Sequence, residues 1–173
     1  MDVLQSIVAF LAGFDPELGD ESKEANLRKA TRLIAKMPVI VAAWERIRKN
    51  MPLTNPDRNL SHAANFLYML KGESPAEEIA KIFDICLILH AEHSFNASTF
   101  AARVVASTRA HMYASIVAGI GALSGELHGG ANSEVMKNLF EIGDPEKVED
   151  WVKGQFDSGK RVMGMVTRSI KMP

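Results

Sequence analysis

The sequence has very little cysteine and no surplus of charge of either sign. Its 173 residues include a single cysteine, Cys86, which excludes an internal disulfide framework and is typical of a reducing compartment. Lys and Arg number 20 against 21 Asp and Glu, so the basic excess of a nucleic-acid-binding protein is missing. No apolar run reaches the roughly 20 residues that cross a bilayer, and Asp2 stands where a signal peptide would carry positive charge. These absences predict a cytoplasmic protein that binds neither nucleic acid nor membrane.

Helical periodicity dominates what is present. Apolar residues make up 47% of the chain, enough for the core of one domain. They recur at helical spacing, and few segments alternate with period two, so the predicted fold class is all-α. In the long helix that starts near residue 22, Arg28, Lys29 and Arg32 should form the exposed face. The expected helices cover residues 3–11, 22–37, 39–48, 61–70, 75–89, 96–123, 132–142, 145–153 and 155–162.

Several helix ends are marked by residue type. Pro38 should kink or end the long second helix, because proline lacks the N–H that an interior helical residue donates. Gly72 should end the helix expected over residues 61–70. Ser74, Pro75 and Glu77 match a cap, a first helical residue and a capping-box partner. The next helix is therefore expected to begin at residue 75.

Two segments have the composition of closely packed helices. After Lys81, the segment 75–89 is almost wholly apolar, which predicts deep burial. The segment 96–123 is rich in Ala and Ser and contains Gly119 and Gly121. Small residues at this density predict a close approach of helices. Both an internal core helix and a subunit interface account for it.

Two histidines, His90 and His93, are three residues apart near the end of the segment 75–89. Residues three apart share a helix face, and Cys86 lies one turn earlier, so the spacing allows a zinc site. The alternatives are a core thiol at Cys86 and a pair of histidines that binds an anion or serves the structure. The residue types alone leave these interpretations open.

The sharper pattern is Leu127–Asn132, which reads Leu-His-Gly-Gly-Ala-Asn. A helix is expected to begin near Asn132, and the free N–H groups at a helix N-terminus suit a carboxylate or an oxyanion. The glycines let a ligand approach the backbone closely. His128 could donate a proton to charge that develops on such a ligand. A plain interhelical turn with an exposed histidine is the alternative.

A basic stretch that contains glycine follows, between Gly154 and Gly164. It includes Ser158, Lys160 and Arg161. Backbone N–H groups and cations in such a stretch could hold phosphates. It lacks a complete P-loop pattern, so a solvated loop is the alternative.

Five stretches of the chain, in family order and with near-family spacing, resemble citrate synthases of the shorter archaeal and bacterial type. They read NLRKATRLIAKMPVI, LSHAANFLYML, LILHAEHSFNASTFAARVVAS, MYASIVAGIGALSG and LHGGANSEVMK, and they occupy residues 26–40, 60–70, 87–107, 112–125 and 127–137. The resemblance covers the chain from Met1 to about Met165. The two histidine motifs together carry most of its specificity.

This resemblance implies a fold and an activity. It implies an all-α homodimer that condenses acetyl-CoA with oxaloacetate to citrate and CoA, as in the tricarboxylic acid cycle. Residues 1–127 would belong to the large, dimerising domain, in which the segment 97–123 is a dimer helix. Residues 128–165 would begin the small, CoA-binding domain.

The resemblance also implies the roles of individual residues. His128 would polarise the thioester carbonyl as a catalytic residue. No metal and no cofactor would be needed, since acetyl-CoA enters as a substrate, and this replaces the zinc interpretation. The residues expected to bind oxaloacetate are His93, His90 and Asn96, and those expected to contact CoA are Lys160, Arg161, Val162 and Gly164.

The sequence departs from the family pattern at its end. The family's catalytic aspartate and its oxaloacetate-binding arginines cannot be assigned here, and Thr167 stands where a Gly-x-Gly-His-x-Val-Tyr-Lys motif carries histidine. Codons for the tail 166–173, read one base earlier, can spell Gly-His-x-Val-Tyr-Lys, so we expect a frameshifted tail and a chain that is inactive alone. Two alternatives remain: a 2-methylcitrate synthase that uses propionyl-CoA, and a catalytically dead helical fragment that dimerises.

Overall fold

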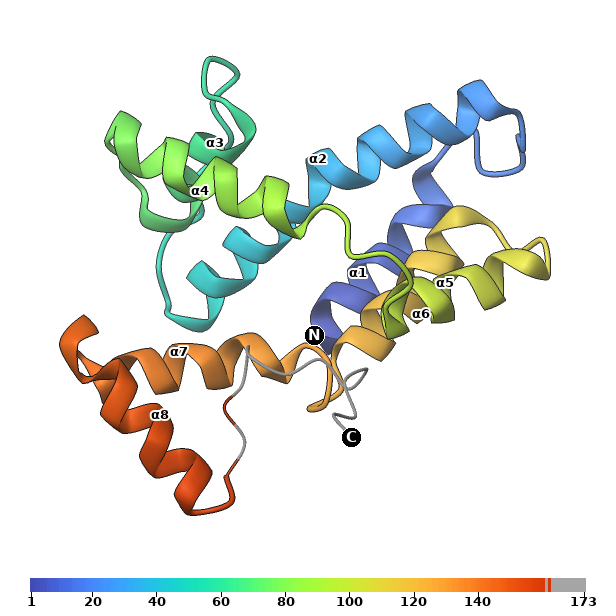
Figure 1. Cartoon of the computed structure of the whole chain (residues 1–173). Helices are drawn as coiled ribbons and strands as arrows, with labels where there is room; N and C mark the ends of the chain where they lie inside the picture. Colours follow the sequence, from blue (N-terminus) through green and yellow to red (C-terminus); the bar gives the residue numbers. More distant parts are fainter. Residues whose placement is uncertain (161, 163–173) are drawn as a thin grey trace. The chain divides into compact units, whose positions relative to one another are not determined.

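Every regular element in the described part of the chain, residues 1–160 and 162 of this computed structural model, is helical (Figure 1). The elements in order are α1 (Asp2–Leu11), η1 (Ala12–Phe14), α2 (Lys23–Arg48), α3 (His62–Lys71), α4 (Glu77–His90), α5 (Ala97–Ser107), α6 (Met112–Leu123), α7 (Gly130–Ile142), η2 (Pro145–Lys147) and α8 (Val148–Asp157). The predicted all-α fold class is therefore confirmed.

The chain forms two compact units, divided between Gly121 and Ala122. The assignment of residues 1–127 and 128–165 to a large and a small domain stays a prediction. None of the helices in the described residues combines the length and the apolar character that a bilayer crossing requires.

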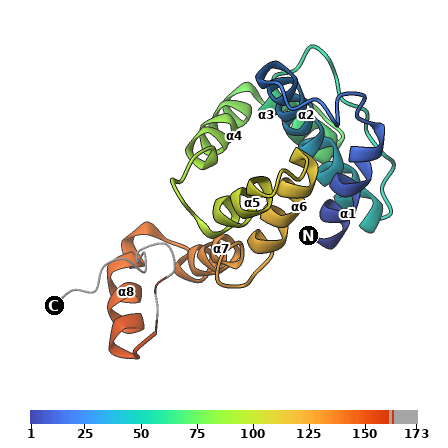
Figure 2. The same cartoon turned by 90° about the vertical axis from the view of Figure 1, so that its right-hand side faces the viewer.

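In the first unit, α6 packs on α1, η1 and α2 through a buried core. A core of five buried residues joins α1, η1, α2 and α6, and its members are Val8, Ala12, Leu33, Tyr113 and Ile120. Figure 2 shows α6 between α1 on one side and α5 on the other. The side chain of Gln5 on α1 donates from Nε2 to the Val117 carbonyl of α6 at 3.1 Å.

The glycines of α6 allow this close packing. A Cβ on Gly119 would lie 3.4 Å from the Ser98 carbonyl oxygen and 3.5 Å from Ala102 Cβ, both on α5. A Cβ on Gly121 would lie 2.8 Å from Gln5 Nε2 on α1. The predicted close helix approach is therefore confirmed within one chain. The role of this segment in a dimer stays a prediction.

The single helix predicted over 96–123 is two helices. Arg109 has a φ of +64°, in the left-handed region, just beyond the end of α5. At the start of α6 the ring Nδ1 of His111 accepts a hydrogen bond from the Ala114 N–H at 3.1 Å. Apolar periodicity does not reveal this break, because the signal lies in two residues that rarely end or cap helices.

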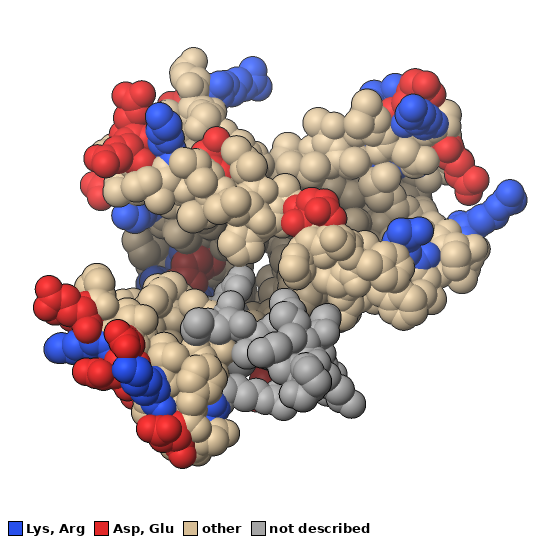
Figure 3. Space-filling view, viewed as in Figure 1, with Lys and Arg blue, Asp and Glu red and all other residues tan. Residues whose placement is uncertain are grey.

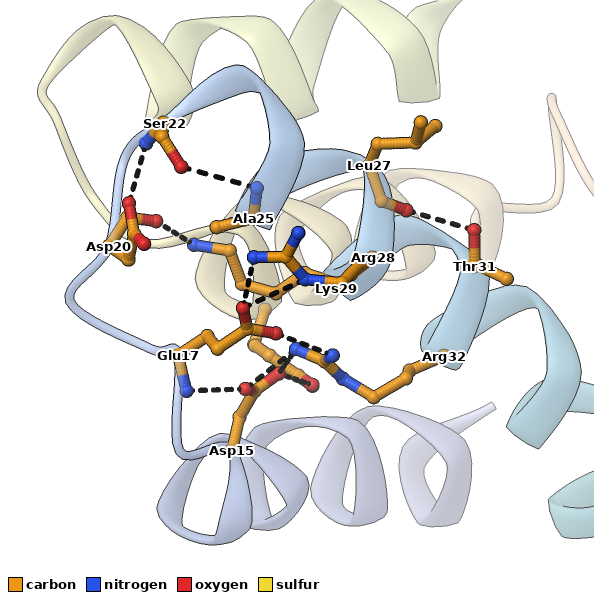
Figure 4. A network of polar contacts seen from close by, with 11 residues as sticks. Asp15, Glu17, Asp20, Ser22, Ala25, Leu27, Arg28, Lys29, Thr31 and Arg32 are labelled. Carbon is orange, nitrogen blue, oxygen red and sulfur yellow. Dashed lines mark hydrogen bonds and ion pairs between the residues drawn. The ribbon is translucent and has the colours of Figure 1, made fainter.

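A charged network joins the loop after η1 to α2 and α6 (Figure 4). Arg32 donates from Nη2 to both carboxylate oxygens of Asp15, at 2.8 and 2.9 Å, and from Nη1 to Glu17 at 2.7 Å. The Tyr113 hydroxyl donates to the same Asp15 carboxylate at 2.5 Å. The prediction that Lys29 lies on the exposed face of α2 is wrong, since it is 2% exposed and donates to the Asp20 carbonyl.

The network shifts the pKa values of its members. Burial acts to raise the pKa of Asp15, whose side chain is 1% exposed. Hydrogen bonds from Tyr113, Arg32 and the Glu17 N–H outweigh burial and lower the pKa of Asp15 from 3.8 to about 2. Hydrogen bonds to Asp15 and Glu17 raise the pKa of Arg32 in turn. Asp15 therefore stays ionised down to strongly acidic pH.

Helix α2 is continuous through Pro38. It runs from Lys23 to Arg48, so of the two predicted effects of this proline, a kink or a helix end, the helix end is wrong. α3 packs on α2 and ends at Gly72, which has a φ of +89°, as predicted. α4 begins at Glu77 after Ala76, which lacks a side-chain cap, so the predicted cap at Ser74 is wrong by two residues.

Deep burial of α4 is a further prediction that the described residues contradict. None of the residues of α4 is buried within this chain. Its contact with α3 includes Phe83, which stacks on Phe66 with ring centroids 5.3 Å apart. Five of its apolar residues are about half exposed or more: Ile79, Ile82, Ile85, Ile88 and Leu89. Figure 3 shows charged side chains at the start of α4 and a mostly uncharged surface along the rest of it.

The second unit consists of the end of α6, the loop that follows, α7, η2 and α8. Asp144 caps η2 by accepting a hydrogen bond from the Glu146 N–H at 3.0 Å. Val162 is buried, at 6% exposure. The predictions for Arg161, Gly164 and the tail 166–173 fall outside the described residues.

Candidate functional site

The connection between α4 and α5 carries the first group of predicted site residues. α4 ends at His90, so His93 lies beyond the helix. The prediction that the two histidines share a helix face is therefore wrong. His90 Nδ1 lies 2.7 Å from the Cys86 carbonyl oxygen, and this hydrogen bond places a proton on Nδ1. Both histidines are exposed. Their rings are accessible to a ligand in this chain.

Asn96 is the N-cap of α5. Its Oδ1 accepts hydrogen bonds from the Thr99 N–H and the Ser98 hydroxyl, both at 2.8 Å. The side-chain oxygen of Asn96 therefore already accepts two hydrogen bonds from residues of α5. Contact with an anionic ligand falls to the amide group of the Asn96 side chain, which can only donate.

The turn between His93 and Asn96 is held by local contacts. Ser94 has a φ of +53°, and its N–H donates to the Glu92 carboxylate. The rings of Phe95 and Phe100 meet edge to face at 5.6 Å between centroids, and the Arg103 guanidinium lies 4.9 Å from the Phe95 centroid. These contacts link the turn to the first two turns of α5.

His128 lies in the loop between α6 and α7, and its residue is half-buried. Its N–H donates to the Gly125 carbonyl at 3.0 Å, and the Gly129 N–H donates to the Leu123 carbonyl at 3.0 Å. A Cβ on Gly129 would lie 2.1 Å from that Leu123 oxygen, so the loop requires glycine at 129. The backbone around His128 is therefore fixed by its own sequence.

α7 begins at Gly130, two residues before the predicted start at Asn132. Within the described residues α7 has no side-chain cap, and Ala131 N–H reaches the His128 carbonyl at 3.4 Å. The first N–H groups of a helix lie at the positive end of the helix dipole, where they suit water or an anion. His128 thus precedes a helix N-terminus by two residues, an arrangement that suits a ligand with developing negative charge.

The basic stretch after α8 differs from a phosphate-binding loop. The N–H groups of Ser158, Gly159 and Lys160 donate to the carbonyls of Gly154, Phe156 and Gln155, at 3.1, 2.9 and 2.9 Å. Gly159 has a φ of +68°, as in a helix C-terminus. Since these N–H groups are used within the chain, any contact of this stretch with CoA falls to side chains such as that of Lys160, which is exposed.

The spacing of Cys86, His90 and His93 does not produce a metal site. Across residues 1–160 and 162, His, Cys, Asp and Glu side chains form no group of three or more that could hold a metal ion. The contact between Cys86 and His90 involves the backbone carbonyl and not the thiol.

The predicted site residues fall in both units. His90, His93 and Asn96 share one loop of the first unit, whereas His128 belongs to the second. The citrate synthase resemblance also implies that His93 and His128 approach one cleft; because they belong to different units, this stays a prediction.

Each unit carries one of the predicted histidine loops, and the loop of His128 precedes a helix N-terminus that lacks a side-chain cap. Residues 1–172 match the family model of the citrate synthase C-terminal domain. The chain is 45% identical to a citrate synthase of Haloferax volcanii, over all of this chain and 47% of the relative. It is 43% identical to a 2-methylcitrate synthase of Mycobacterium tuberculosis, over 95% of this chain and 41% of the relative.

Solved structures agree with this match. A citrate synthase from Pyrobaculum aerophilum has a TM-score of 0.85 at 40% identity, over 95% of this chain and 44% of that one. A citrate synthase from Thermoplasma acidophilum, solved with carboxymethyl coenzyme A and oxaloacetate, has a TM-score of 0.82 at 33% identity, over 98% of this chain and 44% of that one. The chain belongs to the citrate synthase family. It spans less than half the length of these relatives.

Proposed function

We propose that this chain is the histidine-bearing part of a citrate synthase, an enzyme of the tricarboxylic acid cycle that condenses acetyl-CoA with oxaloacetate to citrate and CoA. The observation that carries the proposal is the family match over residues 1–172, which includes both histidine loops. The Thermoplasma acidophilum relative was solved with oxaloacetate and a CoA derivative, and this supports substrates of the same kind here.

Oxaloacetate is a dicarboxylate with a ketone, and His93, His90 and Asn96 would bind it. His93 and the Asn96 amide group can donate to its oxygens. His90 uses its Nδ1 proton on the Cys86 carbonyl, so it offers a second donor only as the imidazolium.

His128 would act on the acyl-CoA. Removal of a methyl proton beside the thioester places negative charge on the carbonyl oxygen. A hydrogen bond from His128 to that oxygen, with the N-terminus of α7 two residues on, would stabilise this charge. We assign no residue of this chain as the base that takes the methyl proton.

CoA enters as part of a substrate, and the residues that would contact it are Lys160, Arg161, Val162 and Gly164. The site would use no further cofactor and no metal.

A second candidate is a 2-methylcitrate synthase that uses propionyl-CoA. The 43% identity to the Mycobacterium tuberculosis relative, over 95% of this chain, favours it. A third candidate is a dimerising helical fragment without catalysis.

We further propose that the chain acts in the cytoplasm as a homodimer. A second copy would cover, among other residues, the apolar residues that are exposed on α4.

The test separates binding from turnover. Oxaloacetate is titrated into the purified chain while the histidine ring resonances are followed by NMR, and CoA release from acetyl-CoA or propionyl-CoA is measured with a thiol reagent. We expect saturable oxaloacetate binding that His93→Ala weakens and His128→Ala leaves intact, with CoA release no faster than that of the His128→Ala variant. Absence of oxaloacetate binding would contradict the proposal.

Turnover would decide between the remaining candidates. Release of CoA well above the His128→Ala variant would overturn the expectation that the chain is inactive alone. A preference for propionyl-CoA in that case would favour 2-methylcitrate synthase, and binding without any turnover leaves the chain as the oxaloacetate-binding part that we propose.

A further inference from the structure

Arg46 is a buried cation at the end of α2. The residue is 5% exposed. Its Nε donates to the Pro52 carbonyl, and its Nη1 donates to the Leu70 carbonyl at 3.1 Å. Gly72 leaves room for the guanidinium, because a Cβ there would lie 3.1 Å from Nη1. The side chain is thus held rigidly between the end of α3 and the loop after α2.

The charge of Arg46 lacks a carboxylate partner among the described residues. The neighbouring Glu45 is already paired with Arg48 and with Lys49, the latter at 2.7 Å. Two backbone carbonyls satisfy part of the guanidinium but do not neutralise it. A buried charge without a counter-charge is costly, so an anion close to Arg46 would be stabilised.

A cavity of about 850 Å³ opens beside Arg46. It lies wholly in the first unit, where α2 and α3 meet. Four cations line it, Arg46, Arg48, Lys49 and Lys71, against the two carboxylates of Glu45 and Glu73. Its volume is within the range of small-molecule sites.

The same cavity has an apolar wall. Trp44 and Phe66 line it, together with Val41, Met51 and Leu70. Trp44 is 41% exposed, so part of its indole remains in contact with solvent. A flat apolar group can stack on such a ring.

We propose that this cavity binds a small organic phosphate, with the phosphate beside Arg46 and Lys71 and the apolar body against Trp44. The two carbonyl bonds of Arg46 engage Nε and Nη1 and leave Nη2 for a phosphate oxygen. Guanidinium and ammonium groups are the side chains that hold phosphates most strongly. None of these residues belongs to the proposed oxaloacetate or acyl-CoA sites, so the two proposals stand or fall separately.

The test uses Trp44 as the reporter. In a Trp151→Phe background, Trp44 is the remaining tryptophan. Phenyl phosphate is titrated at constant ionic strength, with phenol and inorganic phosphate as comparison titrants. We expect a saturable change in Trp44 fluorescence with phenyl phosphate, about tenfold tighter than with either comparison titrant.

Variants locate the binding. Lys71→Gln should weaken phenyl phosphate binding about tenfold, as expected for loss of one charged hydrogen bond. The matched control is Lys153→Gln, which removes an exposed lysine of α8 and should change nothing. Lys71 makes no ion pair among the described residues, so its loss should leave the fold intact. The proposal is overturned if titration gives no saturable change, if Lys71→Gln and Lys153→Gln bind alike, or if phenol binds as tightly as phenyl phosphate.

Discussion

Gly129 donates its backbone N–H to the Leu123 carbonyl at 3.0 Å, and a Cβ on Gly129 would lie 2.1 Å from the same oxygen. This contact between two backbone segments closes the loop that carries His128. A clash with the Leu123 oxygen could not be removed by moving a side chain. Gly129→Ala should therefore displace the loop and the start of α7, at a cost of about 3 kcal/mol. Hydrogen exchange of the amides of residues 125–131 would measure it as faster exchange than in the unchanged protein.

Gly154→Ala is the matched control for this substitution. A Cβ on Gly154, inside α8, would meet no atom within 4 Å. Because alanine is the better helix former, the control should be neutral or stabilising by up to about 1 kcal/mol. If the amides of residues 125–131 exchange at the same rate in Gly129→Ala and in the control, Gly129 does not approach the Leu123 oxygen this closely.

The Asp15 network should make stability depend on acidic pH. The folded pKa of Asp15, about 2, lies below its ordinary value of 3.8. The ionised carboxylate therefore contributes fully above about pH 5, and this contribution, up to about 2 kcal/mol, is lost as the pH falls from about 4 toward 2. Urea unfolding at a series of pH values would measure it.

Asp15→Asn is the control for the acid dependence. It leaves Arg32 without its bidentate partner, so we expect a loss of about 3 kcal/mol at neutral pH. The variant should also show a flatter decline in stability between pH 4 and 2. An unchanged acid decline in Asp15→Asn would show that other carboxylates cause it.

Trp151 is a buried donor without an acceptor. Its indole Nε1 has no hydrogen-bond partner in the described part of the chain. Trp151→Phe removes the unpaired N–H while keeping an aromatic ring, so the unfolding free energy should change by less than about 1 kcal/mol. Trp151→Ala should cost about 3 kcal/mol. Equal losses in the two variants, by thermal or urea unfolding, would contradict this reading.

The exposed apolar residues of α4 should drive association. Ile85 and Ile88 are 49% and 65% exposed in the single chain. We expect a dimer or larger species by light scattering at micromolar concentration, and a shift toward monomer when both residues are changed to Gln. A monodisperse monomer of the unchanged chain would contradict the expectation. Lys153→Gln, which changes an exposed residue of α8, serves as a surface control.

Local sequence signals predicted the helices well but not their surroundings. Gly72 marks the end of α3 because only glycine adopts a φ of +89° there without strain. Asp144 and Pro145 likewise start η2. The break between α5 and α6 was missed because Arg109 and His111 perform roles that other residues usually perform.

Burial was the least predictable property. Lys29 was expected at the surface and is buried, whereas the apolar α4 was expected inside and is exposed in this chain. Composition tells which residues tend to be covered, but not whether the covering atoms belong to the same chain. The candidate site residues were singled out by their motifs and stay predictions, whereas the buried Arg46 belongs to no motif.

The hydrogen bond between Tyr113 and Asp15 joins residues 98 positions apart. Closing a loop of this length costs about 4 kcal/mol of chain entropy before any contact is gained. Contacts of α2 with α3 and of α3 with α4 are local and can form quickly, while α6 must return across the whole intervening chain to cover Val8 and Leu33. During synthesis α1 and α2 therefore leave the ribosome before α6, and the apolar residues that α6 covers are not yet covered by it. Their core closes only after residue 120 has emerged, and chaperones have that interval in which to bind them.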